Sequence, residues 1–323
     1  MLRRFELLIT LMTTLQKHVS RIWPFFCPLS FHEPVAAVFL FHTVEEHPNP
    51  WTHGHRYVTP LSKFKLQITY LKKHFRFVST TNLVEQLAQG RVTENIAAIH
   101  FDDGFRSFKD VALPFLKRQA IPSTLFPIHS VLFGDIPIRN KLAYLLNTDS
   151  RDTLLDRLSI EDSLKRRSNS FILSFLKNEQ ISETDDLVKE IYSMKKRITS
   201  SPFMRAEELV ALKDDPWVEF GSHTLTHPML VRSDLASQRR EIVEGHEKLC
   251  AILEKNLQFF AYPFGGLGHF DEVSRKIIKT MDGVTAFNTF GFLNRSWERT
   301  NVHRITLARH SPWQIKTFLI NRR

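Results

Sequence analysis

The sequence predicts an α/β protein built mainly on parallel strands, with a helical insertion. Short apolar segments alternate with segments of helical periodicity from residue 36 to about residue 128, a pattern typical of parallel strands joined by crossover helices. The alternation stops at about residue 130 and resumes at about residue 206. Polar residues suited to catalysis directly follow the predicted strands, and active sites of α/β proteins gather at such strand ends.

The predicted elements before the interruption are short and well separated. Apolar runs predict strands over residues 36–41, 75–78, 96–99 and 123–128. Helical spacing predicts helices over residues 61–74, from Thr81 or Asn82 to Gly90, and over residues 107–119. Residues 130–205 are charged and helical in pattern, so we expect a helical insertion laid over one end of the core.

The alternation of predicted strands and helices resumes after residue 205. The expected strands cover residues 217–221, 258–262, 284–287 and 304–307, and the expected helices cover residues 206–213, 233–254 and 271–281. We therefore expect one domain over residues 35–323, with the insertion at about residues 130–205.

The composition of the 323-residue chain is that of a globular protein with excess positive charge. The formal net charge of +10 suggests anionic surroundings. No short basic block interleaved with aromatic residues occurs, so we expect no nucleic-acid partner. The two cysteines lack CxxC spacing and indicate neither a disulfide framework nor a cysteine metal site.

The N-terminal segment, residues 1–34, is expected to be helical. Arg3 and Arg4 precede a short apolar run, but Glu6 interrupts its start and no small-residue cleavage site follows, so a signal peptide is not indicated. The run is also too short to span a bilayer. We expect an amphipathic helix that lies on a membrane or packs on the domain, and a cytoplasmic or membrane-peripheral protein.

Two adjacent carboxylates follow the strand at residues 96–99. Asp102 and Asp103 point in different directions at a strand end, so one is able to bind a metal while the other handles a proton. Gly104 lets the backbone turn away at once. The alternative interpretation is an ordinary Asp-Asp-Gly surface turn.

Two histidines follow the strand at residues 217–221. His223 and His227 are four residues apart, and on a helical turn both imidazoles would face the same way. With Asp103 they would form a His-His-carboxylate set, a common arrangement for a catalytic divalent metal. Surface histidines often have this spacing too, so the pair is informative only together with the Asp-Asp-Gly segment.

Three motifs in this order resemble those of the polysaccharide deacetylase family, the NodB-homology domain of carbohydrate esterase family 4. Residues 100–104, His-Phe-Asp-Asp-Gly, resemble the first motif, which is usually Thr-Phe-Asp-Asp-Gly. Residues 222–227 contain the second, His-(Ser/Thr)-x-x-His, and residues 260–265 resemble the third, whose commoner form has Arg before the Pro-Tyr. The resemblance covers residues 35–307 apart from the insertion.

The resemblance implies a deformed (β/α) barrel and hydrolysis of N-acetyl groups on amino sugars. It implies a divalent metal, with zinc expected first and cobalt, nickel or manganese as possible replacements. By position, Asp103, His223 and His227 would be the metal ligands, and Asp102 would be the general base that activates the attacking water.

The third motif implies a place for the substrate and the oxyanion at Tyr262, Pro263 and Phe264. The backbone N–H of Phe264 would help to hold the oxyanion. Ala261 stands where many family members have an arginine that orients the general base. Arg304, near the end of the chain, is the candidate that we expect to replace this arginine.

The family's late Leu-x-His motif, which supplies the general acid, is missing from the C-terminal part of the chain. The pattern occurs instead at residues 40–42, before the Asp-Asp motif, as in deacetylases of biofilm poly-N-acetylglucosamine. We therefore expect His42 to be the general acid, with His303 and His310 as weaker candidates. The alternative is that His42 is a buried, hydrogen-bonded core histidine.

The expected function is removal of N-acetyl groups from an amino sugar in a polysaccharide or a lipid-linked glycan precursor. A deformylase or an O-acetyl esterase would use the same site, and a catalytically silent sugar-binding or glycan-assembly protein is a further alternative. The complete set of base and ligands argues against the silent protein. The positive charge favours an anionic membrane surface or a lipid-phosphate-linked glycan as a partner.

Overall fold

The computed structural model describes residues 31–321 apart from 48, 180–181, 194–200 and 309. The expected N-terminal helix lies almost entirely outside these residues. In the described part of the chain, no helix is both long and apolar enough to cross a membrane.

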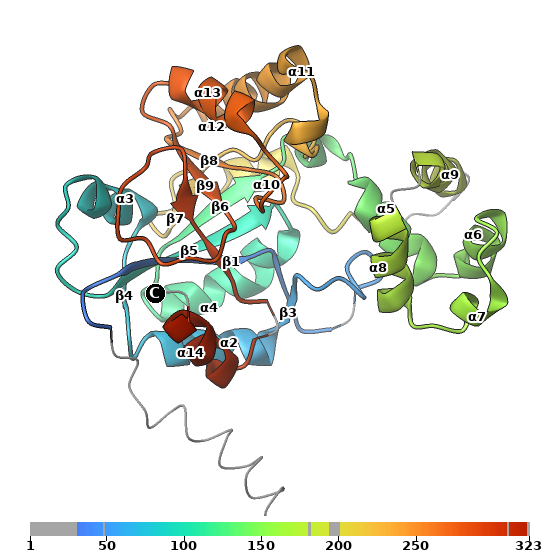
Figure 1. Cartoon of the computed structure of the whole chain (residues 1–323), viewed down its shortest axis with the longest axis horizontal. Coiled ribbons are helices and arrows are strands. Elements are labelled where there is room, and N and C mark those ends of the chain that lie inside the picture. Colours follow the sequence, from blue (N-terminus) through green and yellow to red (C-terminus); the bar gives the residue numbers. More distant parts are fainter. Residues whose placement is uncertain (1–30, 48, 180–181, 194–200, 309, 322–323) are drawn as a thin grey trace, which may run out of the picture.

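The main sheet is parallel and has the candidate Asp-Asp motif on its central strand (Figure 1). Its order is β11 (Ile305–Thr306), β1 (Ala36–Phe41), β5 (Ile96–Asp103), β6 (Ser123–Pro127) and β7 (Val218–Phe220), with β4 (Arg76–Phe77) beside the start of β5. All residues of β1 and β5 are buried, as expected for parallel strands covered on both faces. Strand β5 extends four residues beyond the predicted 96–99 and ends with the two aspartates themselves.

A second parallel sheet has the order β8 (Phe259–Ala261), β9 (Thr285–Asn288) and β10 (Val302–His303). A single bridge between Ser222 and Phe260 links the end of β7 to β8. On the other side, Arg304 alone separates β10 from β11, so the chain passes directly from one sheet to the other. In the described residues the two sheets form an open, barrel-like arrangement and not a closed barrel, consistent with the predicted deformed (β/α) fold.

The helices expected from sequence cover these sheets. They are α2 (Leu61–Leu71), α3 (Thr80–Ala88), α4 (Leu113–Arg118), α10 (Ala206–Val210), α11 (Leu235–Arg239), α12 (Gly245–Leu253) and α13 (Glu272–Thr280). Ser79 caps α3 by accepting a hydrogen bond from the Asn82 N–H, so the cap lies earlier than predicted. A π-helical stretch at Arg240–Glu244 separates α11 from α12, where one continuous helix was expected.

Some elements gave no signal in the sequence. The strands β2 (Thr43–Glu45) and β3 (Val58–Pro60) form a small pair, and the C-terminal helix α14 (Pro312–Asn321) lies beside α2. These elements are short or lack a clear apolar period, so pattern alone does not separate them from loops.

The stretch expected as an insertion contains five α-helices in its described residues, at one side of the main sheet (Figure 1). They are α5 (Ile138–Leu146), α6 (Arg151–Arg157), α7 (Asp162–Lys165), α8 (Asn169–Glu179) and α9 (Ser182–Ser193). They pack around an apolar cluster that includes Leu145, Leu154 and Ile172. The chain rejoins the core at Phe203, which bridges to Phe105 just after the Asp-Asp-Gly turn. This helical stretch is thus attached next to the candidate site.

Candidate metal and catalytic site

The backbone at the end of β5 separates the two carboxylates. Asp103 has a φ of +74° and Gly104 a φ of +84°, so the chain turns in left-handed conformations immediately after Asp102. A Cβ on Gly104 would lie 3.0 Å from the Cβ of Pro127, which leaves little room for a side chain. Both aspartates are buried, so they belong to the interior of a site and not to a surface turn.

His223 and His227 approach Asp103 from a loop that follows β7. The residues between them do not form the predicted helical turn, because Thr224 and His227 each have a φ of +65°. The Thr224 hydroxyl holds this loop by accepting a hydrogen bond from the His227 N–H. The two imidazoles nevertheless lie together, with ring centroids 4.7 Å apart. The spacing therefore predicted the meeting of the side chains but not the backbone that achieves it.

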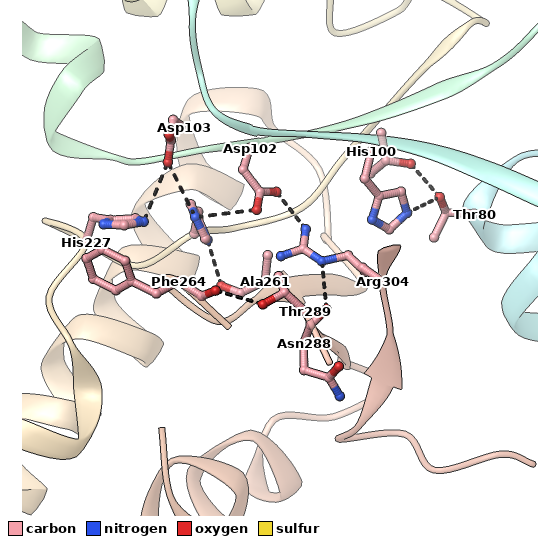
Figure 2. A network of polar contacts seen from close by, with 12 residues as sticks. Thr80, His100, Asp102, Asp103, His227, Ala261, Phe264, Asn288, Thr289 and Arg304 are labelled. Carbon is pink, nitrogen blue, oxygen red and sulfur yellow. Dashed lines mark hydrogen bonds and ion pairs between the residues drawn. The ribbon is translucent and has the colours of Figure 1, made fainter. Parts of the chain in front are cut away.

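The three side chains form a set suited to a divalent metal. One ligand atom from each of Asp103, His223 and His227 lies within 4.8 Å of the others. The Asp103 Oδ1 atom is 3.6 Å from Nε2 of His223 and 3.5 Å from Nε2 of His227 (Figure 2). This buried Oδ1 has no hydrogen-bond partner among the described residues. A buried acceptor beside two imidazole nitrogens fits a cation, and the nitrogen and oxygen donors suit zinc.

Burial shapes the electrostatics of these ligands. Burial is the largest influence on the pKa of His223 and His227 and holds both below the usual histidine value, which favours the neutral form that binds metals. Burial alone would raise the pKa of Asp103, but Arg139 and the nearby histidines hold it below its usual range. The His223 Nδ1 atom lies 2.8 Å from the Ala261 carbonyl oxygen and donates a hydrogen bond to it, so Nε2 presents its lone pair to Asp103.

Arg304 lies against Asp102, the candidate general base. Its Nη1 donates a hydrogen bond of 2.7 Å to Asp102 Oδ1, and its Nε donates one of 3.1 Å to the Asn288 carbonyl (Figure 2). Arg304 is fully buried and is inserted between the two sheets, beneath the ring of Phe126. The other carboxylate oxygen of Asp102, Oδ2, lies 3.8 Å from His223 Nε2 and so faces the candidate metal ligands.

The third motif contacts one of the candidate ligands through Phe264. Phe264 has a φ of +60°, and its ring lies 4.7 Å from that of His227. Its carbonyl accepts a hydrogen bond from the Thr289 hydroxyl (Figure 2). Tyr262 points elsewhere: its ring stacks on Phe270 and its hydroxyl donates to the Thr300 carbonyl. Of Tyr262, Pro263 and Phe264, the structure thus brings the aromatic ring of Phe264 to the ligands.

His42 directly follows β1, beside the end of β5, where Phe41 pairs with Phe101. Its ring stacks on Tyr57 at 5.2 Å, and its buried Nδ1 has no hydrogen-bond partner among the described residues. Burial lowers its pKa, and the Asp103 and Asp102 carboxylates oppose that effect. At Nδ1 the structure therefore shows no core hydrogen bond within the described part of the chain.

The two weaker candidates for the acid have other partners. His303 Nδ1 lies 3.1 Å from Asn288 Oδ1, and His310 Nδ1 lies 2.5 Å from the Leu307 carbonyl. Neither hydrogen-bonds to an aspartate of the site in the described part of the chain.

Arg139 is a site residue that sequence reasoning missed. It comes from α5, in the stretch expected as an insertion, and its Nη2 donates a hydrogen bond of 2.6 Å to Asp103 Oδ2. A single arginine in a long charged helical stretch gives no signal, because most such residues lie on solvated helix faces.

Comparison with known proteins identifies a family that part of this chain resembles. The polysaccharide deacetylase family matches residues 160–286, which include the second and third motifs but not residues 100–104. No curated protein matches the sequence.

Several solved structures share the fold. The Streptococcus pyogenes deacetylase PplD, in complex with acetate, aligns with a TM-score of 0.60 and 14% identity over 89% of this chain and 99% of that chain. IcaB from Ammonifex degensii aligns with a TM-score of 0.58 and 17% identity over 88% and 97% of the two chains. A de-N-acetylase from Aggregatibacter actinomycetemcomitans aligns with a TM-score of 0.58 and 15% identity over 88% of this chain and 99% of that chain. The chain therefore has the fold of the polysaccharide deacetylases and resembles that family in sequence across the second and third motifs.

Proposed function

We propose that this protein is a metal-dependent hydrolase that removes N-acetyl groups from an amino sugar in a polysaccharide or a lipid-linked glycan precursor. The observation that carries the proposal is the convergence of Asp103, His223 and His227 beside a second buried carboxylate, Asp102. The family match and the deacetylases that share the fold support the reaction class.

Asp103, His223 and His227 would hold the metal, most readily zinc. When bound, the metal supplies a Lewis acid that polarises the acetyl carbonyl and makes a water easier to deprotonate. The neutral imidazoles and the ionised Asp103 are already in the protonation states that ligation requires.

Asp102 would act as the general base. Arg304 occupies Oδ1 of this carboxylate, so Oδ2, on the side of the ligands, is the atom that would accept the proton of the attacking water. Arg304 would therefore take the place of the arginine that the third motif lacks at Ala261. The backbone N–H of Phe264 would stabilise the oxyanion that forms from the acetyl carbonyl.

His42 would act as the general acid and donate a proton to the leaving amine of the sugar. It lies at the end of β1 next to the end of β5, and its electrostatic environment is set partly by both aspartates. Its ring is held by stacking on Tyr57, and its Nδ1 makes no hydrogen bond to the described residues.

The test is acetate release by the purified protein from two substrate classes, N-acetylglucosamine oligomers and lipid-linked N-acetyl sugars. Each is assayed with zinc, with cobalt and after chelation. Release that depends on metal supports the proposal, and the preferred class identifies the substrate as polymer or precursor. Formate release from N-formyl sugars, or release only from O-acetyl xylan, would instead identify a deformylase or an esterase. Absence of release with stoichiometric metal would favour a binding protein.

A further inference from the structure

The insertion contributes a cation to the candidate metal site. Arg139 follows Ile138, the first residue of α5, and its side chain reaches Asp103, where its Nη2 lies 2.6 Å from Oδ2. Asp103 is fully buried and the Arg139 side chain is 20% exposed, so this ion pair is largely shielded from water. Such a shielded, charge-assisted hydrogen bond fixes the orientation of a carboxylate far better than a surface pair does.

The surroundings hold the guanidinium in place. Its central carbon lies 5.5 Å from the centre of the Tyr57 ring and 5.7 Å from that of Phe264, within the range of cation–π attraction. The neighbouring Asn140 donates hydrogen bonds to the Trp51 carbonyl and to the Tyr57 hydroxyl. The start of α5 is thus tied both to the loop before β3 and to the third motif.

The two oxygens of Asp103 have different partners as a result. Oδ2 accepts the hydrogen bond from Arg139, whereas Oδ1 lies 3.5 and 3.6 Å from the two imidazole Nε2 atoms and accepts no hydrogen bond from the described residues. A carboxylate that is free to rotate would offer either oxygen, or both, to a cation. With Oδ2 held by Arg139, only Oδ1 faces the histidines.

We infer that Arg139 is a positioning residue that holds Asp103 so that Oδ1 alone binds the metal. This inference rests on the proposed function, because it assumes the metal, and it assigns a role to the insertion that the motifs do not. The insertion is then part of the metal site: α5 must be folded and docked for Asp103 to be oriented. Loss of an outer partner of a metal ligand lowers metal affinity by about 10- to 100-fold in other proteins.

The test compares zinc affinity, measured with a competing chelator, in the full-length wild type, Arg139→Ala, Arg139→Lys and Lys141→Ala. Lys141 is the matched control, because it lies on the same helix and carries the same charge but pairs with Asp135. Arg139→Ala is expected to bind zinc about 10- to 100-fold more weakly. Arg139→Lys should recover part of the affinity, because lysine supplies a point charge without the fixed fork of the guanidinium. Lys141→Ala should match the wild type.

Cobalt provides a second measurement that a general loss of stability would not change. The visible absorption spectrum of bound cobalt reports its coordination, so it should differ between Arg139→Ala and the wild type at metal saturation. Unchanged or tighter zinc binding by Arg139→Ala, with an unchanged cobalt spectrum, would overturn the role of Arg139 while leaving the metal site intact. Failure of the wild type to bind zinc would instead contradict the proposed function itself.

Discussion

At the residue scale, the site uses backbone conformations that most side chains avoid. Asp103, Thr224, His227 and Phe264 all have positive φ, although none is glycine. Such conformations typically cost about 1–3 kcal/mol each and persist where packing and hydrogen bonds over-determine them. Their concentration around one set of ligands is itself an argument that the site is functional.

The role of His42 can be tested through the leaving group. A sugar amine must be protonated as it leaves, whereas the phenolate of para-nitrophenyl acetate leaves without help. We expect His42→Asn to lower kcat for an N-acetyl sugar about a hundred- to ten-thousand-fold, the usual contribution of a general acid. The same variant should lose far less activity on para-nitrophenyl acetate. Equal losses on both substrates would show that His42 acts on structure or binding and not as an acid.

The buried ion pair of Arg304 and Asp102 should contribute to the stability of the folded protein. Both side chains are buried, so Arg304→Met would leave an uncompensated carboxylate and lower the free energy of unfolding by about 3–5 kcal/mol. Adding Asp102→Asn should recover part of this loss, because the double variant no longer buries a lone charge. Denaturant unfolding of the single and double variants measures both effects. A cost below about 1 kcal/mol for Arg304→Met would contradict the pairing.

At the element scale, the sequence indicated where the strands end more reliably than how the loops run. The apolar runs at β1 and β5 correctly placed His42, Asp102 and Asp103 at neighbouring strand ends. The loop from His223 to His227 was expected to be helical, because spacing alone does not reveal left-handed residues other than glycine. Arg139 was missed because its importance depends on how α5 docks, which no local pattern encodes.

The first motif has a histidine where the family usually has threonine, and this residue joins two elements. His100 on β5 shares a hydrogen bond of 2.9 Å with the Thr80 hydroxyl at the start of α3 (Figure 2). Thr80 is also 2.6 Å from the Thr124 hydroxyl, and the Glu219 carboxylate accepts from the Thr80 N–H. His100 therefore joins β5, the strand that carries Asp102 and Asp103, to a buried polar network.

This network predicts how stability depends on pH. Burial holds the pKa of His100 well below its usual value, so between about pH 6.5 and its folded pKa only the unfolded chain takes up the proton. Stability therefore falls as pH decreases below about 6.5, by about 1.4 kcal/mol per pH unit for this group. We expect His100→Thr to reduce that slope by about 1.4 kcal/mol per pH unit, the contribution of one proton. The free energy of unfolding is measured against pH with a metal chelator present. An unchanged slope would mean that His100 is already charged in the folded state.

At the scale of the whole molecule, the site joins parts of the chain that are far apart in sequence. His42, Asp102, His223 and Arg304 come from four strand ends, and Arg139 comes from helix α5. The motifs predicted the fold together with Asp102 and His223, whereas His42 was predicted from the early Leu-x-His pattern and Arg304 from the arginine that the third motif lacks. The contact between α5 and Asp103 was not predictable from the sequence and is seen only in the structure.

Because the candidate ligands come together only in the folded chain, a bound metal should stabilise the folded state. A ligand that binds only the folded state adds about 2.7 kcal/mol at one hundred times its dissociation constant. We expect zinc to raise Tm in the wild type, and chelation to reverse this. His223→Ala should abolish the zinc-dependent increase, because it removes one of the three converging ligands. A zinc-dependent rise of the same size in His223→Ala would place the metal elsewhere.

The most direct test of the central claim is to measure bound zinc and acetate release on the same preparations of wild type, Asp102→Asn and Asp103→Asn. If Asp103 binds the metal and Asp102 is the base, Asp102→Asn keeps stoichiometric zinc while its turnover falls about a hundred- to ten-thousand-fold. Asp103→Asn should lose both zinc and turnover. Full activity in Asp102→Asn, or tight zinc binding in Asp103→Asn, would contradict the assignment of the two carboxylates.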